Sequence, residues 1–525
     1  MVIAGALVVP GGQSHTLARA AGFAALALAL ELAWRCNGVR TPVYRRHLAI
    51  FGLMALLGGV DALRQTGLIG WLADLLGAVL PRLLAALARQ PQPDAAFMRF
   101  ASLLERLPAG VQLLSLFQRN LPLVGRIADV LGAAPQLADH LARTPSALDG
   151  LLEEGEPVPF ARTLKARLVG TVSLEDAIAR IRATVRASDF AISVATLEGR
   201  IDADDAGLQR AALADAALSA LLPRVLADFT ERYGRVRGGS MAVVLLGKAG
   251  GRETMAGSDL DLMLVYDRPE TSIQSVGGRS LPASQWFIRA VHAFVGALTA
   301  PDAEGPMYAV DMRLRPSGNK GPVAVSLASF EGYHAGQAWT WERMALTRAR
   351  VVAGPPQLRA RVEAAIKAAI TSGDPKLILS DAAHMRARMV RELPAAGSWD
   401  VKHRAGGQIE VEFVAQSLQL LHGPMSPTLR LAVAGLRRAG HLTEKEANTL
   451  VRADRIWRTV QGMLRLTDGG RPPAELSDTA LAALLRAMHA SGVDAVDLGQ
   501  LRATLETLAL DVRQVFLTRI GAIET

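Results

Sequence analysis

The sequence predicts an α+β protein in which a small mixed β-sheet core is embedded in mostly α-helical domains. Two observations carry this prediction. Short apolar segments with side chains that alternate between two faces follow one another within residues 241–353, which is typical of strands. On both sides of this region, apolar side chains recur three and four positions apart in a chain rich in alanine and leucine, which favours helices.

The elements can be placed in chain order. Apolar stripes predict helices at 75–90, 97–107, 111–120 and 124–132, and Thr144-Pro145 has the form of a further helix start. Residues 160–230 continue as helices. Strands are expected at 241–247, 258–267, 307–316, 322–327 and 348–354, with one amphipathic helix at 284–300. Residues 357–525 return to helices, which are broken at Gly-Pro, Gly-Gly and Pro-Pro points.

The length of 525 residues is enough for about three domains with separate cores. The patterns divide the chain into a divergent apolar N-terminal segment, a helical linker domain, helices that lead into the core, the sheet-containing core, and a C-terminal helical domain. A short linker is expected at 153–158, near the end of the second of these regions. The expected bounds of the five regions are 1–75, 76–155, 156–240, 241–355 and 356–525.

Composition limits the class of ligand and the compartment. The formal net charge is +9, but basic and acidic residues are intermixed and no long basic run occurs, which favours an anionic ligand over a nucleic-acid tract. Cys36 is the only cysteine, so the chain has neither a disulfide framework nor a cysteine-based metal site. We therefore expect a reducing, cytoplasmic compartment.

The apolar segments near the N-terminus do not predict a membrane span. Charged residues interrupt them, and no uninterrupted apolar run of about 20 residues forms. No basic region precedes them and no cleavage site follows, so they do not form a signal peptide. We expect buried helices here; the segments are 21–36, 49–60 and 67–80, and the interrupting charges are Glu31, Arg35, Asp61 and Arg64.

The most informative stretch is VVLLGKAGGRETMAGSDLDLMLVYD, residues 243–267, which reads as a strand, a glycine turn and a second strand. Because side chains alternate along a strand, Asp259 and Asp261 share the face opposite the apolar one, about 7 Å apart. Two carboxylates on one face repel each other, and a cation between them removes that repulsion. The pair therefore predicts a metal site.

A second stretch, VDMRLRPSGNKG at 310–321, repeats this arrangement. Asp311, Arg313 and Arg315 share the face opposite the apolar side chains. If this strand lies beside the first, a third carboxylate joins the pair and two guanidinium groups follow it. Three carboxylates with Mg²⁺ and arginines suit a polyphosphate, because the metal holds the reacting oxygens and the arginines hold the remaining charge.

A lone Asp-x-Asp motif is more often a solvated turn or a helix cap. The segment RIDADDAG supplies such a case, because no apolar strand surrounds its acidic residues, which are Asp202, Asp204 and Asp205. Asp259 and Asp261 differ because they interrupt an otherwise apolar strand that follows a Gly-Gly turn. This contrast favours the functional interpretation of the second pair.

The segments GKAGGRETMAGSDLDL and DMRLRP resemble motifs of the polymerase-β-like nucleotidyltransferase superfamily. More narrowly, GKAGGRETMAGSDLDLMLVYD, the segment 311–354 and WDVKHRAGGQIEVEFVAQSLQL are similar to the bifunctional glutamine synthetase adenylyltransferase/adenylyl-removing family. The resemblance covers roughly residues 76–525. Members of that family have two related halves, of which the N-terminal one removes AMP from glutamine synthetase and the C-terminal one adds it. RLRPSGNKG and AWTWERMALTRAR resemble the C-terminal half, so we expect adenylylation and expect the removing half to be absent.

The resemblance implies a role for each candidate residue. Asp259, Asp261 and Asp311 would be catalytic and would bind two Mg²⁺ ions, with ATP as the substrate and Asp311 helping to remove the proton of the acceptor tyrosine. The acceptor would lie on glutamine synthetase, and pyrophosphate would be released. The family also implies the PII signal protein and glutamine as regulators. The residues that would contact the nucleotide are Gly250, Gly251, Ser258, Arg313 and Arg315.

Other conspicuous residues favour structural roles. Trp339 and Trp341 are interpreted as core anchors, with adenine stacking as the alternative, and Glu342 is expected to pair with Arg348 or Arg350. Lys248 and Lys320 lie in glycine loops and could touch phosphate. In the segment 399–420, glycines are expected to turn into the next helix, and the acids to cap that helix or to reach the groove, with structural roles favoured. The residues are Asp400, Lys402, Gly406, Gly407, Glu410 and Glu412.

Three alternatives to the adenylyltransferase remain open. One is a uridylyltransferase for PII, although the His-Asp hydrolase unit and sensing repeats of that relative are not visible. Another is a catalytically idle or regulatory fragment, against which the three carboxylates argue. The third is a transferase directed at nucleic acid, which would carry basic and aromatic stripes that we do not find.

Overall fold

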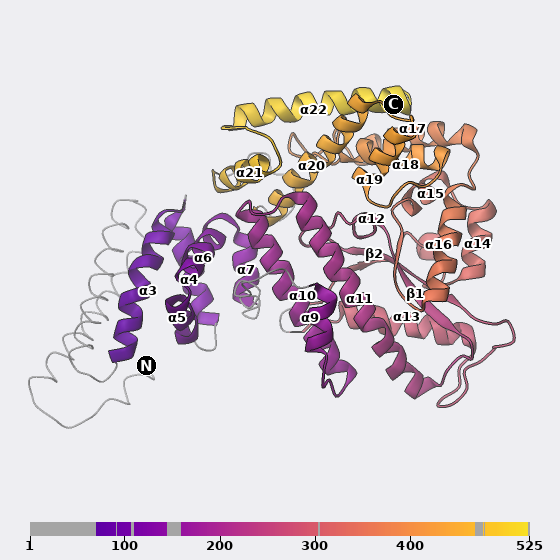
Figure 1. Ribbon diagram of the computed structural model, residues 1–525, viewed down its shortest axis with the longest axis horizontal. Helices are drawn as coiled ribbons and strands as arrows, with labels where there is room; N and C mark the ends of the chain where they lie inside the picture. Colours follow the sequence, from indigo (N-terminus) through magenta and orange to yellow (C-terminus); the bar gives the residue numbers. More distant parts are fainter. Residues whose placement is uncertain are drawn as a thin grey trace, which may run out of the picture. The chain divides into compact units, whose positions relative to one another are not determined.

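The computed structural model describes residues 70–90, 92–106, 110–143, 159–302, 305–467, 476 and 478–522. These residues are mostly helical and contain a mixed sheet of five strands, which confirms the predicted α+β class (Figure 1). The contacts divide the chain into two compact units, Met1–Gly132 and Ala133–Thr525. The expectations for 21–36, 49–60, Thr144-Pro145 and 153–158 lie outside the described residues.

The first unit contains the helices that the apolar stripes predicted. Polar side chains tie them together: the Gln90 side-chain amide donates to Asp129 (2.8 Å), and the Arg99 guanidinium donates to the carbonyl of Leu131 (2.6 Å). The helices are α3 (Gly70–Ala88), α4 (Pro93–Arg106), α5 (Gly110–Arg119) and α6 (Leu121–Ala133).

The second unit begins with helices that lead into the sheet. Ser173 caps α10 and Asp202 caps α11, each by accepting a backbone N–H three residues later. The helix-cap interpretation of the acidic segment at 202–205 is thus confirmed for Asp202, whereas Asp204 and Asp205 lie in the first turn of α11. The helices are α7 (Pro135–Arg143), α9 (Phe160–Arg167), α10 (Leu174–Leu197) and α11 (Ala203–Tyr233).

The sheet has the strand order β3-β2-β1-β5, and β4 also pairs with β2. The strand β1 pairs antiparallel with both β2 and β5, whereas β3 and β4 each pair parallel with β2. Since β1 occupies one edge of β2, both β3 and β4 lie on the other edge. There β3 pairs with the first residues of β2 and β4 pairs with the later ones. The strands are β1 (Ser240–Leu245), β2 (Leu260–Asp267), β3 (Val310–Asp311), β4 (Ala324–Ser326) and β5 (Arg350–Ala353).

The two faces of β2 are those that alternation predicted. Leu260, Leu262 and Leu264 are buried in one cluster with residues of α11 and of α13 (Ala283–Thr299). Asp261 belongs to the opposite face. The helices α14 (Leu327–Gly336) and α16 (Pro356–Ile370) also contact the sheet, and their residues lie outside that cluster (Figure 1).

The third predicted strand, 307–316, is wrong in length, because β3 holds only two residues. The N–H of Arg313 donates to the Asp311 carboxylate (2.8 Å) and not to a neighbouring strand. Pro316 has no N–H to offer a ladder, and Ser317 takes a left-handed conformation with φ 60°. The backbone therefore leaves the sheet directly after Asp311, and the short 3₁₀ helix η3 (Gly318–Lys320) follows.

The C-terminal region is helical, as predicted. The turn before α18 contains Gly406 at φ 69°, and Gly407 is the N-cap of that helix, which confirms the expected glycine turn. No helix within the described ranges is both long and apolar enough to cross a membrane. The helices are α15 (Thr340–Leu346), α17 (Pro375–Glu392), α18 (Gln408–His422), α19 (Leu429–Arg438), α20 (Glu444–Thr467), α21 (Asp478–Ala490) and α22 (Leu498–Arg519).

Candidate active site

Two of the three predicted carboxylates are neighbours in the sheet. Asp261 of β2 and Asp311 of β3 are paired in the parallel register, and Asp259 lies one residue before β2. Burial raises the pKa of Asp261, and the carboxylates of Asp311 and Asp259 raise it further. The structure therefore brings the three carboxylates within electrostatic reach of one another.

A glycine makes room for Asp261. Gly247 begins the short helix α12 (Gly247–Gly250) with a φ of 53°. A Cβ atom at this position would lie 2.1 Å from the Oδ2 of Asp261. Any other residue at 247 would therefore displace that carboxylate, in addition to the strain of a positive φ. The strand-to-helix turn thus fixes one side of the candidate site.

Asp311 is already engaged. The Arg313 guanidinium donates to its Oδ2 (2.7 Å from Nε), and these hydrogen bonds are the main cause of the lowered pKa of Asp311. Within the part of the chain that the structure describes, no three acidic, histidine or cysteine side chains are grouped closely enough to hold a metal ion. Carboxylate oxygens are the donors that Mg²⁺ prefers, so the set suits this ion once Asp311 exchanges Arg313 for it.

Arg315 does not lie beside Arg313. Its side chain is buried, and its guanidinium donates to the carbonyls of Met312 (2.8 Å), Gly321 (3.2 Å) and Pro322 (3.2 Å). These bonds close the loop that follows β3. The predicted row of two arginines on one strand face therefore does not form, because β3 ends at Asp311 and the chain turns.

The Gly-Gly turn serves close packing in this structure. The N–H of Gly250 donates to Leu246 (2.8 Å) and the N–H of Gly251 donates to Gly247 (3.0 Å), so both are used inside the turn. A Cβ atom on Gly250 would lie 2.0 Å from the carbonyl oxygen of Arg348, and one on Gly251 would lie 2.6 Å from its guanidinium. The glycines let the turn approach Arg348 directly.

Ser258 has a partner from the C-terminal helices. Its hydroxyl accepts a hydrogen bond from Arg465 of α20 (3.2 Å), which also donates to the carbonyl of Ala256 (3.1 Å). Sequence reasoning did not find Arg465, because it lies 207 residues from Ser258 in the chain. No local pattern marks it.

Arg348 links the glycine turn to the C-terminal helices. Its guanidinium pairs with Glu253, which follows the turn, and with Glu412 of α18 (2.9 Å). The second oxygen of Glu253 accepts the N–H of Leu429 at the start of α19 (2.9 Å). Burial raises the pKa of Glu253, and the charge of Arg348 and the N–H of Leu429 oppose that rise. We call Glu253, Arg348 and Glu412 the buried ion triad.

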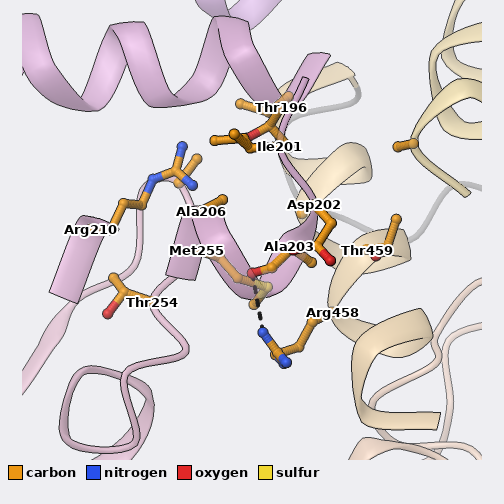
Figure 2. A pocket seen from close by; sticks show the side chains of 14 residues that line it. Thr196, Ile201, Asp202, Ala203, Ala206, Arg210, Thr254, Met255, Arg458 and Thr459 are labelled. Carbon is orange, nitrogen blue, oxygen red and sulfur yellow. Dashed lines mark hydrogen bonds between the residues drawn. The ribbon is translucent and has the colours of Figure 1, made fainter. Parts of the chain in front are cut away.

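A second ionic cluster joins α11 to α20. Arg458 pairs with Asp454 (2.7 Å) and with Asp204, and it donates to the carbonyl of Ala203 (3.2 Å; Figure 2). Gln408 of α18 donates to Asp454 (2.8 Å). Figure 2 also shows residues that line a small cavity beside this cluster; its volume of about 30 Å³ has room for one or two water molecules. Asp204 thus has a role that the cap prediction did not include.

A larger cavity of about 410 Å³ borders the site. Ser258 and Arg465 contribute to its lining, together with residues of α7, α10 and α11. Arg210 in its wall pairs with Asp189 (2.6 Å). The Thr254 hydroxyl, which also faces it, is buried and has no hydrogen-bond partner within the described residues. The cavity therefore joins apolar walls to polar groups beside Ser258.

Two tryptophans and Glu342 differ from expectation. Trp339 is 69% exposed and Trp341 37%, so the prediction of core anchors is wrong; Trp339 occupies the N-cap position of α15, outside the helix face that packs. Glu342 accepts the Trp339 N–H (2.8 Å) and the Tyr333 hydroxyl (2.9 Å), and it does not pair with Arg348 or Arg350.

Residues of the segment 399–420 have mainly structural roles, as expected. Glu410 is fully buried between Arg386 (3.0 Å) and Arg513 (2.8 Å). Asp400 accepts the N–H groups of Ala396 and His403, which lie before α18, and the N-cap of α18 is Gly407, without a side-chain cap, so the predicted acidic cap of this helix is wrong. Glu412 reaches the catalytic core through its ion pair with Arg348.

A mixed sheet that presents carboxylates from two adjacent strands beside a glycine turn is consistent with a nucleotidyltransferase, the class that the sequence resembles. Residues 124–365 match the model of the glutamate-ammonia ligase adenylyltransferase family, and residues 381–519 match that of GlnD PII-uridylyltransferase. Residues 124–365 therefore form a domain of the glutamate-ammonia ligase adenylyltransferase family.

Individual relatives agree with this assignment. The chain is 39% identical over 456 residues to the bifunctional glutamine synthetase adenylyltransferase/adenylyl-removing enzyme of Rhodopseudomonas palustris strain CGA009. The aligned region covers 84% of this chain and 46% of that protein. The enzymes of the same name from Bradyrhizobium sp. strain ORS 278 and Mesorhizobium japonicum are 38% and 40% identical, over 83% and 65% of this chain and 45% and 36% of their own lengths. The chain thus spans under half the length of these relatives.

Proposed function

We propose that this chain transfers AMP from ATP to a tyrosine hydroxyl of glutamine synthetase, with release of pyrophosphate. The observation that carries the proposal is the pairing of Asp261 with Asp311 beside the Gly247 turn, inside the region that matches the adenylyltransferase family. The relatives, whose names state an action on glutamine synthetase, support this choice of acceptor.

Asp259, Asp261 and Asp311 would hold two Mg²⁺ ions, which when bound lower the pKa of a hydroxyl nucleophile and neutralise phosphate charge. Asp311 is the proposed proton acceptor. The carboxylate is ionised at neutral pH and has an oxygen to accept the tyrosine proton, but its lowered pKa makes it a weak base. The role therefore depends on the lowered hydroxyl pKa that bound Mg²⁺ would supply. In the structure the backbone N–H of Arg313 donates to Oδ1 of that carboxylate and its guanidinium donates to Oδ2; the backbone bond can remain when the guanidinium leaves.

Arg313 is also the proposed contact for the leaving pyrophosphate. Its side chain is 73% exposed, so it can leave Asp311 and follow the developing phosphate charge. Ser258 is positioned by Arg465 directly before Asp259 and is proposed to bond a phosphate oxygen. Gly250 and Gly251 are proposed to border the nucleotide, and Arg315 to keep the loop after Asp311 in place.

The proposal is tested by incubating the chain with α-labelled ATP, Mg²⁺ and purified glutamine synthetase. We expect label on the synthetase, and we expect the Asp259→Asn, Asp261→Asn double variant to transfer none. Mapping the labelled peptide by mass spectrometry identifies the acceptor residue. A folded native chain that leaves the synthetase unlabelled would contradict the proposal.

A second candidate activity has one supporting observation, because residues 381–519 match the PII-uridylyltransferase model. That match covers helices α18 to α22 and not the carboxylates of β2 and β3. The same assay with α-labelled UTP and PII protein distinguishes the two: label on PII from UTP would favour uridylylation. We also propose that PII and glutamine regulate the chain, so each should change the rate at which label is transferred from ATP. The proposed location of the reaction is the cytoplasm.

A further inference from the structure

Lys248 in the glycine turn lacks a counter-ion. Its side chain is half-buried, and its ammonium donates one long hydrogen bond, to the side-chain oxygen of Gln461 on α20 (3.5 Å). No carboxylate of the described residues lies within ion-pair distance of it. A charge that is taken out of water without a partner costs free energy, so the surroundings of Lys248 suit an anion.

Other cations converge on the same place. Burial and the charges of Arg465, Lys402 and Arg348 together lower the pKa of Lys248 to about 7, against the opposing effect of Glu412. Arg348 is already neutralised in the buried ion triad. Neither Lys402 nor Arg465 has a carboxylate partner among the residues that the structure describes. Three cations therefore face one region, where Glu412, Asp261 and Asp259 offset part of their charge without forming an ion pair with any of them.

Polar donors accompany these cations. The side-chain amide nitrogen of Gln461 is buried and has no acceptor within the described ranges. Arg465 uses one nitrogen to hold Ala256 and Ser258, which places its charge near Asp259. The cluster thus lies next to the first carboxylate of the candidate active site.

We propose that Lys248, Lys402 and Arg465, together with Gln461, bind the polyphosphate of the nucleotide, so that the C-terminal helical region supplies one side of the nucleotide site. This inference rests on the proposed function for the identity of the nucleotide. Arg465 and Gln461 come from α20, and Lys402 comes from the turn before α18. A nucleotide bound there would contact residues of both matched regions, 124–365 and 381–519.

The chemistry fits a polyphosphate better than a single phosphate group. The carboxylates of Asp259 and Asp261 require a metal ion before they can approach phosphate, whereas the cations can bind it directly. A chain of phosphates can satisfy both at once, with one part at the metal and another at Lys248 and Arg465. Adenosine or AMP offers too few phosphate oxygens to reach both.

The test measures binding to the full chain in the presence of Mg²⁺, by titration calorimetry, of tripolyphosphate, α,β-methylene-ATP and AMP. We expect Lys248→Gln and Arg465→Gln each to weaken the binding of tripolyphosphate and of the ATP analogue by about tenfold to a hundredfold. Binding of AMP should change less than about twofold, since it does not span the cluster. Lys402→Gln should have a smaller effect, because Lys402 is exposed.

Matched variants separate binding from structure. Arg452→Gln removes the same charge from an exposed position of α20 that lies about 20 Å along the helix from Arg465. This variant should leave the affinities for tripolyphosphate, α,β-methylene-ATP and AMP unchanged. Lys248→Arg should keep the affinity for tripolyphosphate. Equal losses for AMP and tripolyphosphate in Lys248→Gln and Arg465→Gln, or no loss for either, would overturn the inference.

The outcomes also separate this inference from the proposed function. A native chain that binds the ATP analogue through these residues, but leaves glutamine synthetase unlabelled, would contradict only the proposed function. A chain that labels the synthetase while its variants bind tripolyphosphate normally would overturn only the inference.

Discussion

Replacing Arg348 by methionine should destabilise the fold by about 3–5 kcal/mol, because it leaves two carboxylates without their cation. Arg348 is 5% exposed as a residue and Glu253 3%, so water cannot take the place of the lost guanidinium. Glu412 also loses its ion pair of 2.9 Å. Methionine occupies a similar space, so the expected loss comes mainly from the two unpaired charges and less from packing.

The sign of the pH dependence follows from the same geometry. Without Arg348, burial should raise the folded-state pKa values of Glu253 and Glu412 above their unfolded values of about 4.3. A carboxyl group with a raised folded-state pKa keeps its contribution to stability below the unfolded pKa and loses it as pH rises through the folded one. The free energy of unfolding of Arg348→Met should therefore fall further below that of the native chain at pH 8 than at pH 5.

Denaturant unfolding of the native chain and Arg348→Met at both pH values tests this prediction. The matched control is Arg361→Met, which breaks the pair with Asp267 at a side chain that is 58% exposed and should cost under about 1 kcal/mol. Equal losses for the two variants would refute the argument that the buried ion triad stabilises the contact between the core and α18. So would a larger loss for Arg348→Met at pH 5 than at pH 8.

Three further predictions follow from single residues. Gly250→Ala should destabilise the chain by about 3 kcal/mol or more in the same unfolding assay, because the new Cβ would meet backbone carbonyl oxygens, whereas Gly332→Ala in α14 has open space and should be neutral or slightly stabilising. Asp261→Asn should abolish label transfer yet raise the melting temperature of the ligand-free chain at pH values above 7. Burial and neighbouring carboxylates raise the folded-state pKa of Asp261, so its ionisation costs stability as pH rises, and asparagine removes that cost. A lower melting temperature of the variant would contradict this. The affinity for α,β-methylene-ATP should fall by up to about tenfold per pH unit from pH 7 to 9, because Lys248 has a pKa of about 7 and must bind a proton with the anion, and Lys248→Arg should remove this slope.

The parts of the site that sequence reasoning found depend on local periodicity. Alternation along β2 was enough to place Leu260, Leu262 and Leu264 on one face and Asp261 on the other, and the pairing of Asp261 with Asp311 followed once the two strands were taken as neighbours. Such a period of two is a property of a few consecutive residues, so it can be read without knowledge of the rest of the fold.

The parts that it missed depend on contacts between distant segments. Arg465 meets Ser258 and Glu412 meets Arg348 only because α18 and α20 pack against the core, and no spacing in the sequence records this. Trp339 shows the opposite error, since apolarity favours burial but its N-cap position leaves the ring exposed. Arg315 was misplaced because a proline and a side-chain hydrogen bond end β3 two residues after it begins.

The measurement that tests the central claim most directly compares two labels of ATP in the reaction with glutamine synthetase and Mg²⁺. Adenylylation predicts that the α-label appears on the synthetase and that the γ-label is released as pyrophosphate, with neither transfer in the Asp259→Asn, Asp261→Asn variant. Appearance of the γ-label on the synthetase, or α-label transfer that survives in the double variant, would contradict the account.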